Sequence, residues 1–326
     1  MISKLIAIKP FSDPYINITW QVSDFCNFKC SYCNPGNWAG NNEKKNSAED
    51  FDKIIKNLDI ILTQHESRGY HGFKFFFSGG EPTVWPHLIP LINWLKQRLD
   101  DPHIAINTNL STSTNWWKEH YHLFHDIVAS YHIDFANTPR YIDNIVFLQD
   151  KVNYLCCRMM MQEDRFDEVI AFGKTIPTLL QNYNLEWVPL FDDISTTVGP
   201  WQYSEQRMYD FFETHTFESQ TKMYKPNGSK WHTSSKEVYE SGYEQTLNGN
   251  RLVAERKNFF SGWKCFVDES LFINSTGHIT AASCGQGPTL GNIYKTVTTI
   301  SDPITCKKVQ CTCGTDILIT KEKTNG

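Results

Sequence analysis

Short apolar runs alternate with segments of helical periodicity through the first 190 residues of the chain. Phe73–Phe77 is nearly all apolar, which is typical of a strand buried on both faces of a parallel sheet. In 51–62, apolar residues recur every three or four positions, which predicts an amphipathic helix. The predicted strands are 15–22, 73–77, 104–109, 126–132, 152–161 and 185–190, and the predicted helices are 47–62, 88–95, 116–125, 141–148 and 165–180.

This alternation of strands and helices predicts an α/β fold built from βα units around a parallel sheet. Six such units in about 190 residues are too few for a closed barrel of eight strands. We therefore predict a partial (β/α)6 TIM-like barrel over residues 1–199. In sheets of this kind the chemistry gathers at the carboxyl ends of the strands.

The pattern changes after the sixth predicted strand. Residues 200–256 are polar and aromatic, and we expect one helix at 203–215 within a linker or a lid that contacts substrate. In the last segment, 257–326, two strand-like runs at 270–273 and 278–282 flank a turn sequence that contains Gly. We expect a small C-terminal domain built on this β-hairpin.

Composition and charge narrow the classes of protein further. The net charge of −5 gives no electrostatic reason to expect a nucleic acid partner. The N-terminus lacks the long apolar segment of a signal peptide, and the longest apolar run is too short to cross a membrane. Ten cysteines without an export signal favour metal ligation in a reducing compartment, so we expect a cytoplasmic protein.

Three of these cysteines, Cys26, Cys30 and Cys33, follow the first predicted strand at a C-x3-C-x2-C spacing. We call residues 26–33 the cysteine loop. A loop this short can direct three thiolates at three irons of a cubane cluster and leave the fourth iron open to a substrate or cofactor. Structural zinc usually takes four ligands from paired C-x2-C units, so the spacing favours a cluster. A structural zinc site and buried thiols are the alternatives.

Five more cysteines, which we call the tail cysteines, lie near the C-terminus. Cys265 and Cys284 bracket the predicted hairpin and can converge at its open end. Cys306, Cys311 and Cys313 follow at a C-x4-C-x-C spacing. The tail cysteines indicate a second metal site, for which the spacing alone favours neither zinc nor iron–sulfur.

Two motifs together resemble the radical S-adenosylmethionine (SAM) superfamily. The cysteine loop matches the C-x3-C-x2-C signature of that family and includes the aromatic Tyr32 before its last cysteine. The sequence Ser78-Gly79-Gly80-Glu81-Pro82, directly after a predicted strand, resembles the GGE motif of the family. The tail is similar to the shorter of the family's auxiliary-cluster domains, the Twitch type, which is related to the longer SPASM type.

The resemblance implies cofactors and a reaction. Cys26, Cys30 and Cys33 would hold a 4Fe-4S cluster that binds SAM, and the tail cysteines would hold a second, auxiliary 4Fe-4S cluster. One electron, from a reducing partner such as flavodoxin or ferredoxin, cleaves SAM to methionine and a 5′-deoxyadenosyl radical, which abstracts a hydrogen atom from the substrate. The cofactor carries this chemistry, while the protein supplies placement and excludes water.

The resemblance also implies roles at the SAM site. Gly79 and Gly80 would let the backbone approach the methionine moiety closely, and their exposed amides and carbonyls, with Glu81 nearby, would meet its ammonium group. Tyr32 would pack beside the adenine. Candidates for the ribose hydroxyls and the SAM carboxylate are Asn107, Thr108, Asn109 and Ser130. The alternatives are a simple turn for the glycines and ordinary loop capping for the other positions.

Three residues on the fifth predicted strand, Cys156, Cys157 and Arg158, are candidates for catalysis. One of the cysteines can donate a hydrogen atom to a substrate radical, and Arg158 can bind a substrate carboxylate. A buried Cys is more often a small apolar residue. Further candidate bases or substrate binders, with solvated loop acids as the alternative, are Glu186, Asp192 and Asp193.

We therefore expect a radical SAM oxidoreductase with an auxiliary cluster. Enzymes with Twitch tails resemble this chain in size and include dehydrogenases of sugars and aminocyclitols, so a small molecule of that kind is the first substrate hypothesis. A ribosomal-peptide maturase, which forms crosslinks or epimerises residues, is the second. A non-catalytic metal-binding or electron-transfer protein is the alternative of another class. We do not favour the molybdenum-cofactor cyclisation enzyme, which ends in Gly-Gly, because this chain ends Thr324-Asn325-Gly326.

Overall fold

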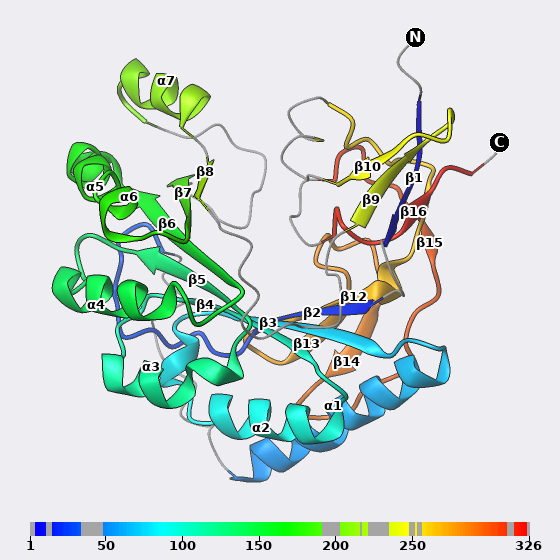
Figure 1. Ribbon diagram of the computed structural model, residues 1–326. Helices are drawn as coiled ribbons and strands as arrows, with labels where there is room; N and C mark the ends of the chain where they lie inside the picture. The colour runs from blue at the N-terminus through cyan, green and yellow to red at the C-terminus, as the bar shows by residue number, and fades with distance from the viewer. Residues whose placement is uncertain are drawn as a thin grey trace.

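The structure is a computed structural model (Figure 1). It describes residues 4–10, 15–33, 48–190, 203–215, 217–220, 235–247, 252, 256–311 and 316–324. Three predicted site residues lie outside these ranges, namely Asp192, Asp193 and Cys313. In the described part of the chain the strands form one sheet of ten strands and one of six.

Six parallel strands form the centre of the larger sheet, in chain order from β2 to β7. Phe75 and Phe77 of the apolar run on β3 are fully buried on one face of the sheet, and Phe76 on the other face is half-buried. The six strands are β2 (Tyr15–Gln21), β3 (Gly72–Ser78), β4 (His103–Thr108), β5 (Asp126–Tyr131), β6 (Tyr154–Met161) and β7 (Tyr183–Pro189). The predicted α/β fold with six βα strands is confirmed.

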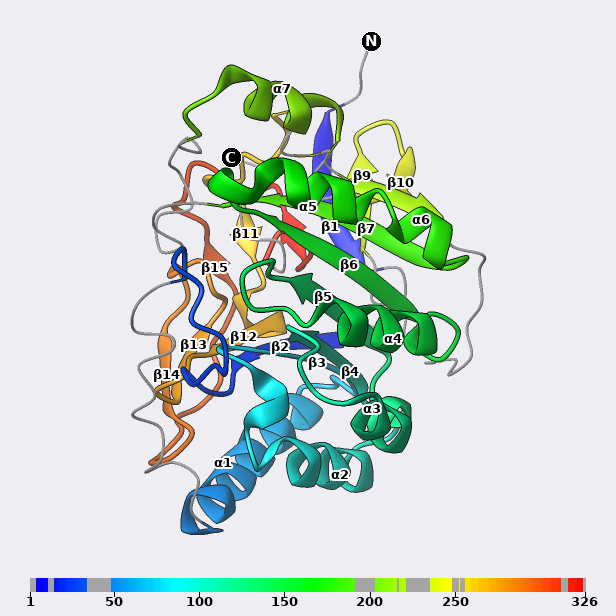
Figure 2. The same cartoon turned by 90° about the vertical axis from the view of Figure 1, so that its left-hand side faces the viewer.

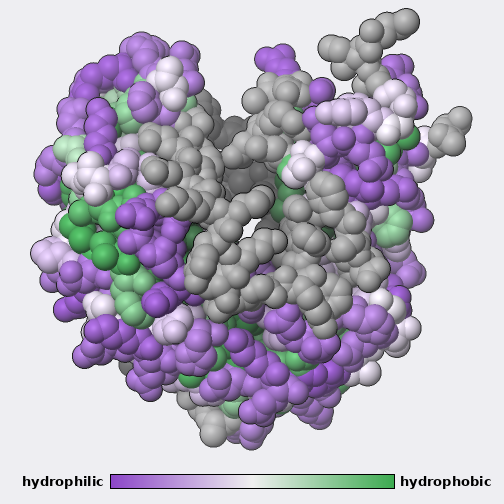
Figure 3. Space-filling view, viewed as in Figure 1, coloured by the Kyte–Doolittle hydropathy of each residue, from purple (hydrophilic) through white to green (hydrophobic). Residues whose placement is uncertain are grey.

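Helices follow these strands and cover their outer side (Figures 1 and 2). They are α1 (Ala48–Ser67), α2 (Leu88–Arg98), α3 (Thr114–His120), α4 (Thr138–Leu148), α5 (Phe166–Gly173) and α6 (Ile176–Leu179). The part of the surface over α1 and α2 is mostly hydrophilic (Figure 3), as the amphipathic pattern predicts. No helix among the described residues is long and apolar enough to cross a membrane.

The prediction of one helix over 165–180 is wrong, because two helices, α5 and α6, occupy this segment. Gly173 ends α5 at a point where a Cβ atom would lie 2.3 Å from the indole of Trp187 on β7. Pro177 stands at the start of α6, where its missing amide hydrogen costs nothing. The helix predicted at 116–125 also ends earlier than expected, at His120.

The C-terminal hairpin extends the same sheet beyond β2. β12 (Ser270–Ile273) pairs in parallel with β2 and antiparallel with β13 (His278–Ala281), which confirms the predicted hairpin. β14 (Thr289–Asn292) continues this edge, and β8 (Phe217–Gln220) closes the other edge against β7. The tail thus lies directly beside the first barrel strand.

The six-stranded sheet joins the two ends of the chain. β1 (Leu5–Pro10), which the sequence analysis did not predict, lies between β9 (Ser235–Tyr239) and β16 (Lys321–Glu322). The remaining strands are β10 (Glu244–Thr246), β11 (Lys264–Cys265) and β15 (Ile304–Thr305). The helix predicted at 203–215 is present as α7 (Gln206–Thr214).

Candidate active site

Gly79 and Gly80 lie against residues 23–25, which lead directly into the cysteine loop. The Gly80 amide donates to the Ser23 carbonyl oxygen at 2.8 Å, and the Glu81 amide donates to that of Phe25 at 2.9 Å. A Cβ atom at Gly80 would lie 2.1 Å from the Phe25 oxygen. Gly79 has a φ of 129°, and a Cβ atom there would lie 2.5 Å from the Ser23 oxygen. Only glycine permits this close approach of two backbones, so the pair positions the thiols.

The Glu81 carboxylate is 1% exposed and is engaged by protein donors through both oxygens. Oε1 accepts from the hydroxyls of Thr83 at 2.6 Å and Thr108 at 2.7 Å, and Oε2 accepts from the Asn109 amide at 2.6 Å. Burial raises the pKa of Glu81, and these hydrogen bonds oppose the rise. Glu81 thus ties the end of β3 to the end of β4, and its contact with an ammonium group stays a prediction.

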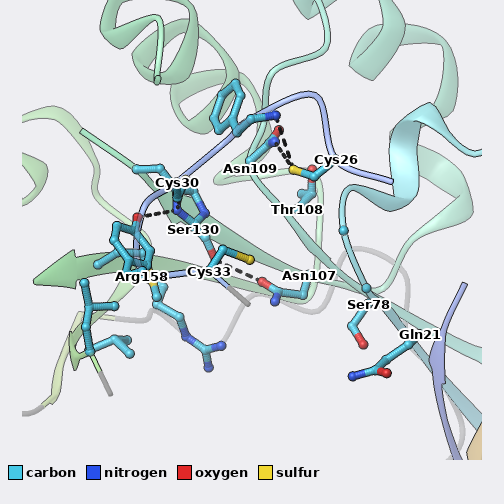
Figure 4. A pocket seen from close by; sticks show the side chains of 18 of the residues that line it. Gln21, Cys26, Cys30, Cys33, Ser78, Asn107, Thr108, Asn109, Ser130 and Arg158 are labelled. Atoms are coloured by element: carbon cyan, nitrogen blue, oxygen red, sulfur yellow. Dashed lines mark hydrogen bonds between the residues drawn. The ribbon is translucent and has the colours of Figure 1, made fainter. Parts of the chain in front are cut away.

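A cavity of about 370 Å³ opens at the carboxyl ends of β2 to β7, beside the cysteine loop (Figure 4). Its walls therefore lie where βα architecture places chemistry. The lining residues are Gln21, Cys26, Phe28, Cys30, Tyr32, Cys33, Ser78, Gly79, Gly80, Asn107, Thr108, Asn109, Ser130, His132, Arg158, Met160, Val188, Pro189 and Leu190. Of the predicted motif residues, Glu81 and Pro82 stand outside this lining.

The three loop thiols reach this one cavity, and none of them is in a disulfide. Cys26 Sγ accepts from the Phe28 amide at 3.3 Å and lies 3.8 Å from Asn109 Nδ2. Burial raises the pKa of Cys26 and of Cys30 to about 11. Because these thiols hold their protons, they suit a positively charged metal cluster that displaces the protons and takes three thiolate ligands. Among the described residues, no three or more Cys, His, Asp or Glu side chains are placed to hold a single metal ion.

His132 holds Tyr32 and Cys30, and the sequence analysis did not single it out. Its Nδ1 lies 2.7 Å from the Tyr32 hydroxyl oxygen and 3.5 Å from Cys30 Sγ. The His132 and Tyr32 rings stack with their planes 10° apart. Burial lowers the pKa of His132 to about 4, so the ring is neutral near neutral pH. The sequence feature that could have identified His132 is its position just after β5, two residues beyond the candidate Ser130.

The candidate ribose and carboxylate binders line the cavity and already have protein partners. Ser130 Oγ donates to Asn107 Oδ1 at 3.0 Å, which links the ends of β5 and β4. Asn109 Nδ2 donates to Asn27 Oδ1 of the cysteine loop at 2.9 Å. The structure brings these residues and Thr108 to one cavity, and their roles toward SAM stay predictions.

Of the three candidates on β6, only Arg158 lines the cavity. Its Nε donates at 2.7 Å to Oε2 of Glu186, the residue paired with it on β7. Cys156 and Cys157 are 1% and 0% exposed and stand outside the lining. Burial raises the pKa of Cys156 to about 11, so its thiol is protonated near neutral pH. At β6 the wall therefore presents the guanidinium of Arg158 rather than a thiol.

Four tail cysteines meet at a second, smaller cavity of about 20 Å³. They are Cys265, Cys284, Cys306 and Cys311, and none of them is in a disulfide. Burial raises the pKa of Cys265 to about 12, and the nearby thiols of the other three raise it further. The thiols are not placed to hold a single metal ion, and their number matches the four thiolates that a 4Fe-4S cluster takes.

The fold and the three-thiol cavity define the class of this part of the chain. Residues 20–172 match the model of the Radical SAM superfamily. The match includes the cysteine loop, the glycine pair and strands β3 to β6. These residues are therefore a radical SAM domain, which points to an enzyme and implies SAM and a 4Fe-4S cluster.

The curated proteins similar to this chain are GTP 3′,8-cyclases. That of Pasteurella multocida (strain Pm70) is 24% identical over 115 residues, which are 34% of this chain and 32% of that protein. That of Actinobacillus pleuropneumoniae serotype 7 (strain AP76) is 24% identical over 104 residues, or 31% of this chain and 28% of that protein. The similarity thus spans about a third of the length of these relatives.

Solved structures similar to this one include two that contain bound ligands. Streptococcus suis SuiB bound to the precursor peptide SuiA is 14% identical with a TM-score of 0.47, over 88% of this chain and 64% of that one. BtrN in complex with AdoMet and 2-DOIA is 12% identical with a TM-score of 0.40, over 86% of this chain and 80% of that one. At this level of similarity neither structure assigns a substrate to this chain.

Proposed function

We propose that the chain is a radical SAM oxidoreductase that abstracts a hydrogen atom from a small molecule of the sugar or aminocyclitol kind. The observation that carries the proposal is the meeting of Cys26, Cys30 and Cys33 with the polar strand ends at one cavity. When bound, the cluster and SAM supply the 5′-deoxyadenosyl radical.

The chain's own residues would bind and orient the cluster and SAM. Cys26, Cys30 and Cys33 would hold the cluster, and the amide hydrogen bond to Cys26 Sγ favours the thiolate form. The glycine pair fixes the loop, and the neutral His132 fixes the Tyr32 ring beside the cavity. A one-electron donor of the flavodoxin or ferredoxin type completes the proposal.

The size and polarity of the cavity support a small polar substrate. About 370 Å³ lies within the usual range for small-molecule sites. Among the described lining residues, Arg158 is the charged one, and its guanidinium offers hydrogen-bond donors to substrate hydroxyl groups (Figure 4). A ribosomal peptide is the alternative substrate.

For the tail, we propose an auxiliary 4Fe-4S cluster on Cys265, Cys284, Cys306 and Cys311, in a domain of the Twitch type. The support is the meeting of these four thiols at one cavity. Such a centre would accept an electron from the substrate or bind the substrate. A structural zinc ion is the alternative occupant, because zinc also takes four thiolates.

Anaerobic reconstitution with iron and sulfide, followed by dithionite and SAM, tests the proposed reaction class. We expect 5′-deoxyadenosine as a product. A non-catalytic electron-transfer protein would bind the same iron but would form no 5′-deoxyadenosine. Absence of 5′-deoxyadenosine from protein with an intact first cluster would therefore reject the enzyme.

A further inference from the structure

A fully buried lysine, Lys321, stands beside the tail cavity. It is 1% exposed and lines the same space as the tail thiols. β16 pairs with β11 so that Lys321 lies directly opposite Cys265. Residues paired in this way on antiparallel strands project from the same face of the sheet. The lysine side chain therefore extends alongside the thiols.

Its ammonium group has hydrogen-bond acceptors but, among the residues that the structure describes, no ion-pair partner. Nζ donates to the carbonyl oxygens of Asp316 and Ile319 and lies 5.3 Å from the centre of the Phe260 ring. The Asp316 carboxylate accepts instead from the hydroxyls of Ser270 and Ser283. A buried charge is costly without a counter-charge, so this arrangement needs negative charge nearby.

Glu269 is within electrostatic reach of Lys321 and supplies only part of that charge. Its carboxylate accepts from the Thr320 amide at 2.7 Å. Burial raises the pKa of Glu269 to about 7, so a large fraction of this carboxyl is protonated near neutral pH. The remaining groups that can be negative at the cavity are the Asp316 carboxylate, which is held by the two serine hydroxyls, and the four thiols.

We propose that Lys321 is the buried counter-charge of an anionic metal–thiolate centre on Cys265, Cys284, Cys306 and Cys311. Four thiolates outnumber the positive charge of a zinc ion or of an oxidised 4Fe-4S core, so the loaded centre is anionic. The ammonium group lowers the cost of gathering the thiolates and favours the addition of one electron to the centre. This inference rests on the proposed tail centre and is independent of SAM cleavage.

The test uses the full chain with Cys26, Cys30 and Cys33 changed to Ala, so that bound metal reports on the tail alone. Lys321→Gln removes the charge and keeps a donor for the two carbonyls, Lys321→Met removes both, and Lys321→Arg keeps the charge. Lys307→Met removes an exposed lysine of the same segment and is the matched control. Each protein is titrated anaerobically with ferrous iron and sulfide, and its reduction potential is then measured.

We expect Lys321→Gln and Lys321→Met to weaken iron binding about tenfold and to make reduction about tenfold less favourable, which is about 59 mV for a one-electron couple. Lys321→Arg and Lys307→Met should stay within about twofold of the parent. The metal-free Met variant should melt no lower than the parent, because it has lost an uncompensated buried charge.

Unchanged affinity and potential in the Gln and Met variants would overturn the inference. Lower metal-free stability in all three Lys321 variants with an unchanged potential would also overturn it, because that result describes a structural lysine. If the tail takes zinc, a tenfold loss of zinc affinity supports the inference and equal affinity overturns it. A parent that binds neither metal overturns it together with the tail centre, while 5′-deoxyadenosine from the wild type leaves the first site intact.

Discussion

At the residue scale, Gly80 makes the closest approach between the glycine pair and the segment that leads into the cysteine loop. Gly80→Ala would place a methyl group 2.1 Å from the Phe25 carbonyl oxygen, a backbone atom that cannot rotate away. We expect the substitution to lower the free energy of unfolding by about 1–3 kcal/mol and to reduce iron bound at the loop. Denaturant unfolding and iron analysis measure both effects.

The matched control for this prediction is Gly69→Ala. Gly69 has a φ of 87° and no neighbouring atom within 4 Å, so alanine there meets backbone strain alone. We expect that variant to lose about 1–2 kcal/mol and to bind iron normally. Normal iron binding by Gly80→Ala would show that the glycine pair does not position the loop.

Glu269 predicts a dependence of stability on pH. Burial raises its pKa from 4.5 to about 7. The folded state therefore holds this proton more tightly than the unfolded state, and stability is lost as the pH rises from about 4.5 to about 7. The loss amounts to about 3 kcal/mol. Glu269→Gln should flatten the curve of unfolding free energy against pH in this window, and a curve as steep as that of the wild type would contradict the assignment.

Sequence analysis at this scale found the thiols and missed their supports. Cys26, Cys30 and Cys33 lie within eight residues of one another, so their spacing can be recognised from the sequence alone. His132 lies about a hundred residues from Cys30 along the chain, and only the approach of β5 to the cysteine loop makes it a neighbour. The tertiary donors to Glu81, Thr108 and Asn109, could not be foreseen, because they follow another strand of the sheet.

At the scale of elements, the β6–β7 pair carries the ion pair of Arg158 and Glu186. Both side chains are about a third exposed, so the pair contributes little to folding, about 0.2–1 kcal/mol. We expect Arg158→Gln to leave stability nearly unchanged and to keep SAM affinity within about twofold, because we assign Arg158 to the substrate. Calorimetric titration with SAM measures this, and a tenfold weaker affinity would assign Arg158 to SAM instead.

The strands with apolar runs were predictable, and those held by distant partners were not. β3 buries one face fully and the other in part, and it carries its own signal in Phe73–Phe77. β1 becomes a strand through its pairing with β9 and β16, which lie more than two hundred residues away. β11, β15 and β16 have two residues each, too few for any periodicity to show.

At the scale of the whole molecule, the chain brings two thiol cavities into one protein. We propose a division of the chain into 1–199, 200–256 and 257–326. β1 crosses this division, because it pairs in the six-stranded sheet whose other strands come from the last two segments. The parallel pairing of β12 with β2 attaches the tail to the first barrel strand. The strand that leads into the cysteine loop thus also anchors the tail.

Iron content tests the two-centre arrangement. We expect about eight irons per reconstituted wild-type chain, because each 4Fe-4S cluster holds four. Changing Cys26, Cys30 and Cys33 to Ala should leave about four irons, and so should changing the four tail cysteines of the small cavity. Zinc, or no metal, in the first variant would contradict the auxiliary cluster.

The central claim is that the cysteine loop forms a SAM-cleaving site, and 5′-deoxyadenosine formation tests it most directly. Reduced wild-type protein, Cys30→Ala and Cys306→Ala are each incubated with SAM under anaerobic conditions. We predict product from the wild type, product from Cys306→Ala without added substrate, and none from Cys30→Ala. Equal product from Cys30→Ala and the wild type, or none from a wild type with its loop cluster intact, would contradict the account.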